Sequence, residues 1–191
     1  GDACTTTGYS KVTEQVCTRL YAAGWDVHVL GIAYNGDPHK FPYRIYPAVD
    51  PNYGGPRNGA ARLKPIMDRV KPDVVLVYGD VNGAVGAARA AKKLGITIGH
   101  VEAGLRSFDD TMPEEHNRIE IDTLADLLFC SEQSGVDHLK KEKVKGDVHL
   151  VGNTMIDSLL WAKPIIERLA SDIRKRMKAS PGKSFVIATI H

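Results

Sequence analysis

The sequence predicts a doubly wound, Rossmann-like α/β fold built on a parallel sheet, and three observations support this. Apolar runs of strand length alternate with stretches whose apolar residues recur at helical spacing. The run DVVLVYG at 73–79 is almost continuously apolar, which is typical of a strand buried on both faces. Beyond residue 72 the connections are short, and strands that alternate with helices through short loops form parallel sheets.

In chain order, the first predicted elements are a helix at 9–26, a strand at 26–32, a long loop at 33–56 and a helix at 58–70. Gly24 is expected to end the first helix. The loop is rich in glycine, proline and tyrosine, and it contains a candidate short strand at 43–46. Pro65 is expected to kink the second helix, because proline removes a backbone hydrogen bond there.

The rest of the chain alternates strictly, with strands at 73–79, 96–102, 127–130, 147–152 and 183–191 and helices at 82–95, 113–126, 131–143 and 153–177. Pro113 suits the first turn of its helix. Ser131 is the expected N-cap of the next helix. Pro164 is expected to break the last helix into two.

Composition excludes several classes of function. The net charge of +2 comes without a basic stripe, which argues against nucleic-acid binding. No apolar run is long enough to cross a bilayer, and no signal peptide is visible, so we expect no membrane partner. The three cysteines lack metal-site spacing and favour a reducing, cytoplasmic location.

Unusual polar residues follow the predicted strands. Ligands bind at the carboxyl ends of strands in this fold class, and Asp80 and Glu102 each follow a strand there. Glu114 and Glu115 lie on the first turn of a helix, where matching the helix dipole is an equally good explanation. The natural cationic partners of these carboxylates are Arg106 and Arg118.

Crowded carboxylates beside an arginine suit general acid–base chemistry, because like charges raise the pKa of one member of the group. Oxygen ligands for magnesium are the competing interpretation, but the arginines and the lack of an aspartate-rich loop argue against a metal. Gly8, near the start of the first helix, is a weak candidate for close backbone approach to a phosphate.

Four motifs resemble the non-hydrolysing UDP-N-acetylglucosamine 2-epimerases: GHVEAGLRSFDDTMPEEHNR, VYGDVNG, VGNTMIDSLLW and the final ATIH. The resemblance covers residues 57–191. It implies two Rossmann-like domains of the GT-B type, with an active site between them and no cofactor. It also implies interconversion of UDP-GlcNAc and UDP-ManNAc by elimination and re-addition of UDP, in a possible homodimer that serves polysaccharide biosynthesis.

The same resemblance implies roles for individual residues. Asp80, Glu102 and Glu114 match the carboxylates used for proton transfer at C2 and for positioning the sugar. Arg118 and His191 match residues near the phosphates and the ring, and His191 is grouped with the catalytic residues. The expected substrate-binding residues are Gly8, Lys11, Arg106 and Arg118.

The beginning of the chain departs from this pattern. Residues 1–50 are more similar to the N-terminal part of a family 4 glycosyltransferase. The expected division is a Rossmann-like domain at 1–165, a helical linker at 166–183 and, at 184–191, the first strand of a nucleotide-binding domain or a strand that pairs into the main sheet. The truncated chain is expected to be inactive. A nucleotide-sugar glycosyltransferase and a non-catalytic fragment or chimera are the alternative interpretations.

Overall fold

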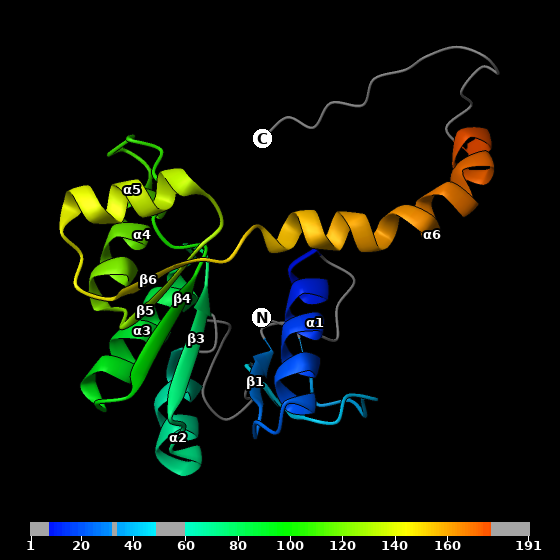
Figure 1. Ribbon diagram of the computed structural model, residues 1–191. Helices are drawn as coiled ribbons and strands as arrows, with labels where there is room; N and C mark the ends of the chain where they lie inside the picture. Colours follow the sequence, from blue (N-terminus) through cyan, green and yellow to red (C-terminus); the bar gives the residue numbers. More distant parts are fainter. Residues whose placement is uncertain (1–7, 32–33, 49–59, 177–191) are drawn as a thin grey trace. The chain divides into compact units, whose positions relative to one another are not determined.

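The computed structural model describes residues 8–31, 34–48 and 60–176, and its elements are labelled in Figure 1. Six helices and six strands lie in these ranges: α1 (Gly8–Ala22), β1 (His28–Gly31), β2 (Arg44–Pro47), α2 (Ala60–Val70), β3 (Val74–Tyr78), α3 (Asn82–Lys93), β4 (Thr97–Val101), α4 (Pro113–Leu124), β5 (Leu127–Cys130), α5 (Gln133–Glu142), β6 (Asp147–Leu150) and α6 (Thr154–Arg176). The chain divides into two compact units, residues 1–154 and 155–191.

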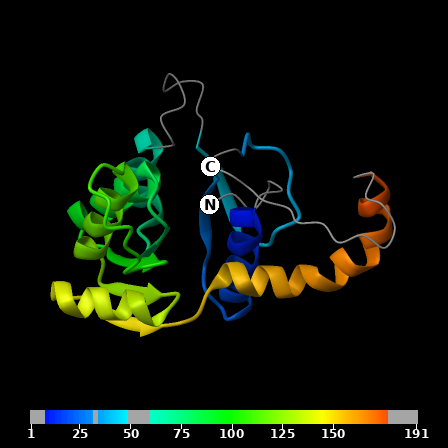
Figure 2. The same cartoon turned by 90° about the horizontal axis from the view of Figure 1, so that it is seen from above.

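The main sheet of the first unit has the order β3-β4-β5-β6, and every pair of neighbouring strands is parallel. Figures 1 and 2 show α3, α4 and α5 along one face of this sheet. The alternation along β4 and β5 turns Ile98 and Leu128 toward these helices, and both side chains are fully buried. The predicted Rossmann-like α/β fold is therefore confirmed for this part of the chain.

Alanine on α3 allows the helix to lie close to the sheet. Ala84, Ala87, Ala88 and Ala91 are all buried, and the last two have no exposed surface. Ile121 of α4 and Leu139 of α5 complete the same apolar core. This core fixes the carboxyl ends of β3 and β4 and the amino end of α4, which carry the candidate site.

A separate two-stranded parallel sheet joins β1 to β2. The predicted short strand in the long loop is confirmed as β2, in register from His28 opposite Arg44. Val29, Tyr43 and Ile45 are buried in a second, smaller apolar cluster on this sheet.

Two expectations about helix ends and breaks are wrong. Pro164 lies inside α6, which runs without a break from Thr154 to Arg176. One proline removes one backbone hydrogen bond, and strong helix formers on both sides, such as Ala162 and Glu167, keep the helix continuous. The N-cap of α5 is Glu132 rather than Ser131, and it makes no capping hydrogen bond through its side chain.

The proposed domain boundary at 165–166 lies within α6, and the predicted strand at 184–191 lies outside the described residues. The division into three segments therefore stays a prediction. α6 has 23 residues, but neither it nor any other helix in the described ranges is long and apolar enough to cross a membrane.

Candidate active site at the carboxyl ends of β3 and β4

Asp80 and Glu102 lie next to each other because they follow neighbouring parallel strands. Tyr78, the last residue of β3, pairs with Val101, the last residue of β4. The Gly79 amide donates a hydrogen bond of 3.1 Å to the Val101 carbonyl, which extends the pairing into the turn. Gly79 also lies close to the Glu102 carboxylate, since a Cβ at this glycine would be 3.6 Å from Glu102 Oε2.

Glu102 has an unusual backbone and an unusual electrostatic environment. Its φ of 73° lies in the left-handed region, which residues with a side chain seldom adopt. The Glu102 amide donates to the Phe129 carbonyl at 3.1 Å, which helps to hold this conformation. Burial, followed by the charge of Asp80, raises the pKa of Glu102 above its ordinary value. A carboxyl group with a raised pKa in an open strand-end position is well suited to exchange protons.

Arg118 of α4 joins the two sides of the site. Its Nε donates to Asp80 Oδ2 at 2.8 Å, and its NH1 donates to Glu115 Oε2 at 2.7 Å. Arg118 and Asp80 are only partly buried, with 18% and 24% of their side-chain surface exposed. The nearby Asn117 also donates to the Asp80 carbonyl at 2.7 Å, so α4 fixes both the backbone and the side chain of Asp80.

Glu115 holds the loop after β4 in place. Its carboxylate accepts hydrogen bonds from the Ser107 amide at 2.9 Å, the Ser107 hydroxyl at 3.0 Å and the Phe108 amide at 3.1 Å. Burial raises the pKa of this group, but these hydrogen bonds and Arg118 outweigh burial and lower its pKa to about 2. Glu115 is 2% exposed, whereas Glu114 is exposed on the same turn. The sequence did not separate their roles.

We expect the free energy of unfolding to decrease at acid pH because of Glu115. Its pKa is about 2 in the folded chain against 4.5 for an ordinary glutamate, so its contribution is complete above pH 4.5 and is lost as pH falls toward 2. The lowered pKa corresponds to about 3 kcal/mol of stability at neutral pH. Urea unfolding of Glu115→Gln at pH 7 should show a loss of this size, and the loss should shrink between pH 4.5 and pH 2.

Glu114→Gln is the matched control, because it removes a carboxylate from the same helical turn. Its stability should change by no more than about 1 kcal/mol, the size of an exposed charge at a helix N-terminus. Equal losses in both variants would show that the helix dipole, rather than the loop contacts, gives Glu115 its effect.

Arg106 lies in a different position from the one expected of a substrate ligand. Its side chain is 2% exposed and pairs with Asp122 at 2.8 Å and with Glu142 at 2.6 Å. Burial lowers the pKa of the guanidinium, but hydrogen bonds to Glu142 and Asp122 outweigh it and raise the pKa above the ordinary value. The contacts favour a role for Arg106 in holding the loop after Glu102 over direct contact with substrate.

The other predicted site residues are dispersed or outside the described ranges. Gly8 is the first residue of α1, and Lys11 of the same helix pairs with Glu14 at 2.7 Å. His191 lies outside the described residues. Within the described ranges, no group of three or more His, Cys, Asp or Glu side chains is arranged to hold a metal ion. The cluster that the structure brings together is thus Asp80, Glu102 and Arg118.

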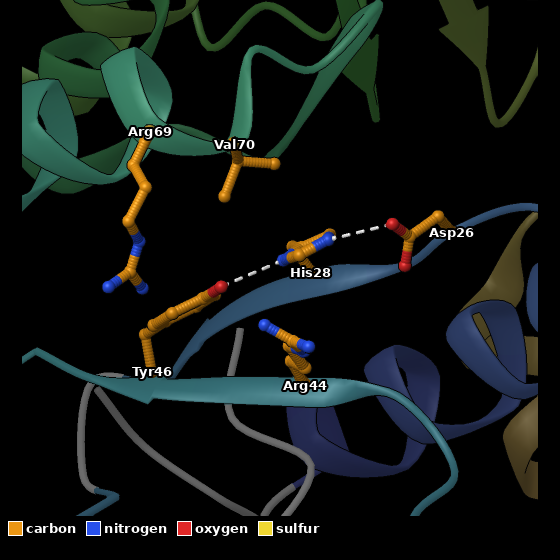
Figure 3. Close-up of a pocket in the computed structure, with 6 residues that line it drawn as sticks. All are labelled: Asp26, His28, Arg44, Tyr46, Arg69 and Val70. Atoms are coloured by element: carbon orange, nitrogen blue, oxygen red, sulfur yellow. Dashed lines mark hydrogen bonds and ion pairs between the residues drawn. The ribbon is translucent and has the colours of Figure 1, made fainter.

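Apart from the candidate active site, a polar pocket lies near the amino ends of β1 and β2, and Figure 3 shows the residues that line it. His28 and Arg44 begin these two strands, and Arg69 lies in the last turn of α2. The His28 ring contacts the Tyr46 hydroxyl at 3.0 Å, and the Arg69 guanidinium lies 5.2 Å from the centre of the Tyr46 ring. Substrates of this fold class bind at carboxyl ends, so we do not assign this pocket to the candidate active site.

Comparison with known protein families places most of the chain in one group. The family described as UDP-N-acetylglucosamine 2-epimerase matches residues 58–191. A "UDP-N-acetylglucosamine 2-epimerase homolog" of Methanococcus maripaludis is 42% identical over 130 residues, which are 68% of this chain and 36% of that protein. A "UDP-2,3-diacetamido-2,3-dideoxy-D-glucuronate 2-epimerase" of Pseudomonas aeruginosa is 40% identical over 132 residues, 68% of this chain and 35% of that protein.

Among solved structures, the Methanocaldococcus jannaschii UDP-GlcNAc 2-epimerase in complex with UDP-GlcNAc and UDP is similar, with a TM-score of 0.66. The two sequences are 28% identical, and the match covers 81% of this chain and 46% of the other. The chain therefore spans between about a third and a half of the proteins that it matches.

Proposed function

The chain belongs to the UDP-N-acetylglucosamine 2-epimerase family, and from this premise we propose that it supplies the acid–base half of an active site that inverts C2 of a UDP-linked 2-acetamido sugar. The carrying observation is that Glu102, with its raised pKa, lies beside Asp80 and near Arg118 at the carboxyl ends of β3 and β4. These residues fit a reaction that removes and returns the proton at C2.

We assign a role to each residue of the cluster. Glu102 accepts the C2 proton while UDP leaves, and a 2-acetamidoglucal intermediate forms. Asp80 is oriented by Arg118, so it is placed to bind the sugar or to return a proton. We assign to Glu114, which is exposed on the first turn of α4, the role of the second carboxyl group, and to His191 contact with the leaving phosphate.

Two substrates fit this assignment. The M. jannaschii structure contains UDP-GlcNAc and UDP, and the P. aeruginosa relative is named for a diacetamido uronate that is also linked to UDP. Both sugars carry the 2-acetamido group at the carbon that is inverted. We propose UDP-GlcNAc as the substrate, because the family description names it.

Deuterium incorporation at C2 tests the proposal. Residues 58–191 would replace the corresponding segment of the M. jannaschii enzyme, because the chain matches only 46% of that protein. In heavy water, NMR should show deuterium entering C2 of UDP-GlcNAc and UDP-ManNAc accumulating. Release of UDP only in the presence of an acceptor sugar would instead support a glycosyltransferase. If a folded chimera shows neither event, catalysis by these residues is contradicted.

The remaining expectations stay predictions. They are a homodimer, a cytoplasmic location and a place in polysaccharide biosynthesis. The family match begins at residue 58, so the first part of the chain, with Gly8 and Lys11, has no support from this family match. Its glycosyltransferase-like sequence stays a prediction as well.

A further inference from the structure

A fully buried histidine and aspartate lie directly beneath the candidate site, and the proposed reaction uses neither. His100 of β4 and Asp122 of α4 have no exposed surface. His100 Nδ1 is 2.7 Å from Asp122 Oδ1, and His100 Nε2 is 3.1 Å from the Gly79 carbonyl oxygen. The histidine therefore joins α4 to the turn that carries Asp80.

Both partners of the imidazole ring are hydrogen-bond acceptors. A backbone carbonyl can only accept, and an ionised carboxylate can only accept. Arg106 NH1 forms an ion pair of 2.8 Å with Asp122 Oδ2, and the Gly104 amide donates to the same oxygen at 3.2 Å. A neutral imidazole has one N–H, so one of its two ring nitrogens would face an acceptor oxygen with no hydrogen between them. A buried polar atom without a partner is costly, and a doubly protonated ring satisfies both contacts.

We propose that His100 is a buried imidazolium ion that Asp122 holds, and that this cation positions the Gly79–Asp80 turn and favours the ionised form of Glu102. The local charges balance: His100 and Arg106 are positive, and Asp122 and Glu142 are negative. This balance makes a buried cation acceptable, because each charge has an opposite charge within hydrogen-bonding distance.

The effect on the active site follows from position. His100 precedes Glu102 by two residues on β4, and its positive charge opposes the rise in the pKa of Glu102 that burial and Asp80 cause. Among the described residues, the other charged or titratable groups that interact with this region include Asp80 on the β3 turn, Arg118 on α4, Tyr78 of β3 and Cys130 of β5. Asp122 is thus a positioning residue, because it acts on the proposed base through His100 and touches no substrate atom in this assignment.

NMR of the ring nitrogens of the chain tests the proposal without any turnover. With ¹⁵N-labelled histidine, His100 should show two slowly exchanging N–H protons between pH 6.5 and pH 8, one on each nitrogen. His116 is the matched control, because it is on the exposed side of α4 with one carbonyl contact, from Nε2 to Asp110 at 2.9 Å. Because its ring is exposed to solvent, it should not show two slowly exchanging N–H protons. A single N–H on His100 at pH 7.5 would overturn the proposal.

The Asp122→Asn variant supplies the second readout. It should remove one of the two His100 N–H signals, and the loss of that cation should raise the pH at which the Glu102 carboxyl titrates in ¹³C spectra. If Asp122 acts only through packing or through its own charge, His100 keeps its state and removal of the negative charge lowers the Glu102 midpoint. The direction of the shift therefore decides the question.

This inference rests on the proposed function only for the role of Glu102 as the base. The protonation state of His100 is measured on the chain itself, so it can fail while the C2 exchange test succeeds. The reverse outcome can also be distinguished. If His100 is doubly protonated but the chimera shows no exchange at C2, the His100 proposal stands and the epimerase proposal fails.

Discussion

Glu102→Gln is expected to abolish C2 exchange in the chimera while leaving the chain folded. The amide keeps the shape of the side chain but cannot accept a proton, and general-base catalysis contributes about 10²- to 10⁴-fold to rates. We therefore expect the rate of deuterium entry to fall by at least about 10²-fold. Glu120→Gln is the matched control, because Glu120 lies on the exposed side of α4 and pairs with Arg89. Its exchange rate should be unchanged.

The same variant should raise the stability of the chain at pH 7. The folded state raises the pKa of Glu102, so ionisation of this residue opposes folding once pH exceeds the ordinary value of 4.5. Glutamine removes that opposition, and the melting temperature should rise at pH 7 but not below pH 4. Unfolding of the variant would instead show that Glu102 is a structural residue, and unchanged exchange would remove it from the mechanism.

Gly104→Ala is expected to cause the largest loss of stability. Gly104 has a φ of 77°, and an added Cβ would lie 2.3 Å from the Gly135 carbonyl oxygen on α5. Backbone cannot move aside as a flexible side chain can, so the loop after β4 and α5 must separate. Overpacking together with a left-handed backbone should cost about 3 kcal/mol or more, measured by urea unfolding.

Gly95→Ala separates the two causes of this loss. Gly95 has a φ of 70°, but an added Cβ would meet nothing within 4 Å. Its replacement should cost only about 1–2 kcal/mol, which is the strain of a left-handed alanine. Similar losses at both positions would show that the contact with Gly135 has no effect on stability.

The sequence was sufficient for the parts of this protein that depend on periodicity and on strand ends. The apolar run at 73–79 and the alanine-rich segment after it became β3 and α3. Asp80 and Glu102 were brought together because parallel strands end at the same edge of a sheet, which is a general property of the fold class. Arg118 as the partner of Asp80 also followed from charge and position.

The side-chain partners could not be predicted in the same way. Glu114 and Glu115 are identical in type and adjacent, and only the fold of the loop decides that Glu115 accepts the Ser107 and Phe108 amides. Arg106 had two candidate uses, and its ion pair with Glu142 of α5 could not be read from the sequence. Asp122 gave no signal, since a single aspartate late in a helix is usually a surface residue.

Three residues of α4 make their contacts only because they lie on the same side of the helix. Glu115, Arg118 and Asp122 are spaced so that they share one side of the helix, and each successive residue turns by about 100° around its axis. Loss or gain of a single codon between Glu115 and Asp122 would swing one end of this row away from its partners. An insertion or deletion between Glu115 and Asp122 is therefore expected to disrupt the site. A change of length in the exposed loop at Asp109–Thr111 leaves the spacing of these three helix residues unaltered.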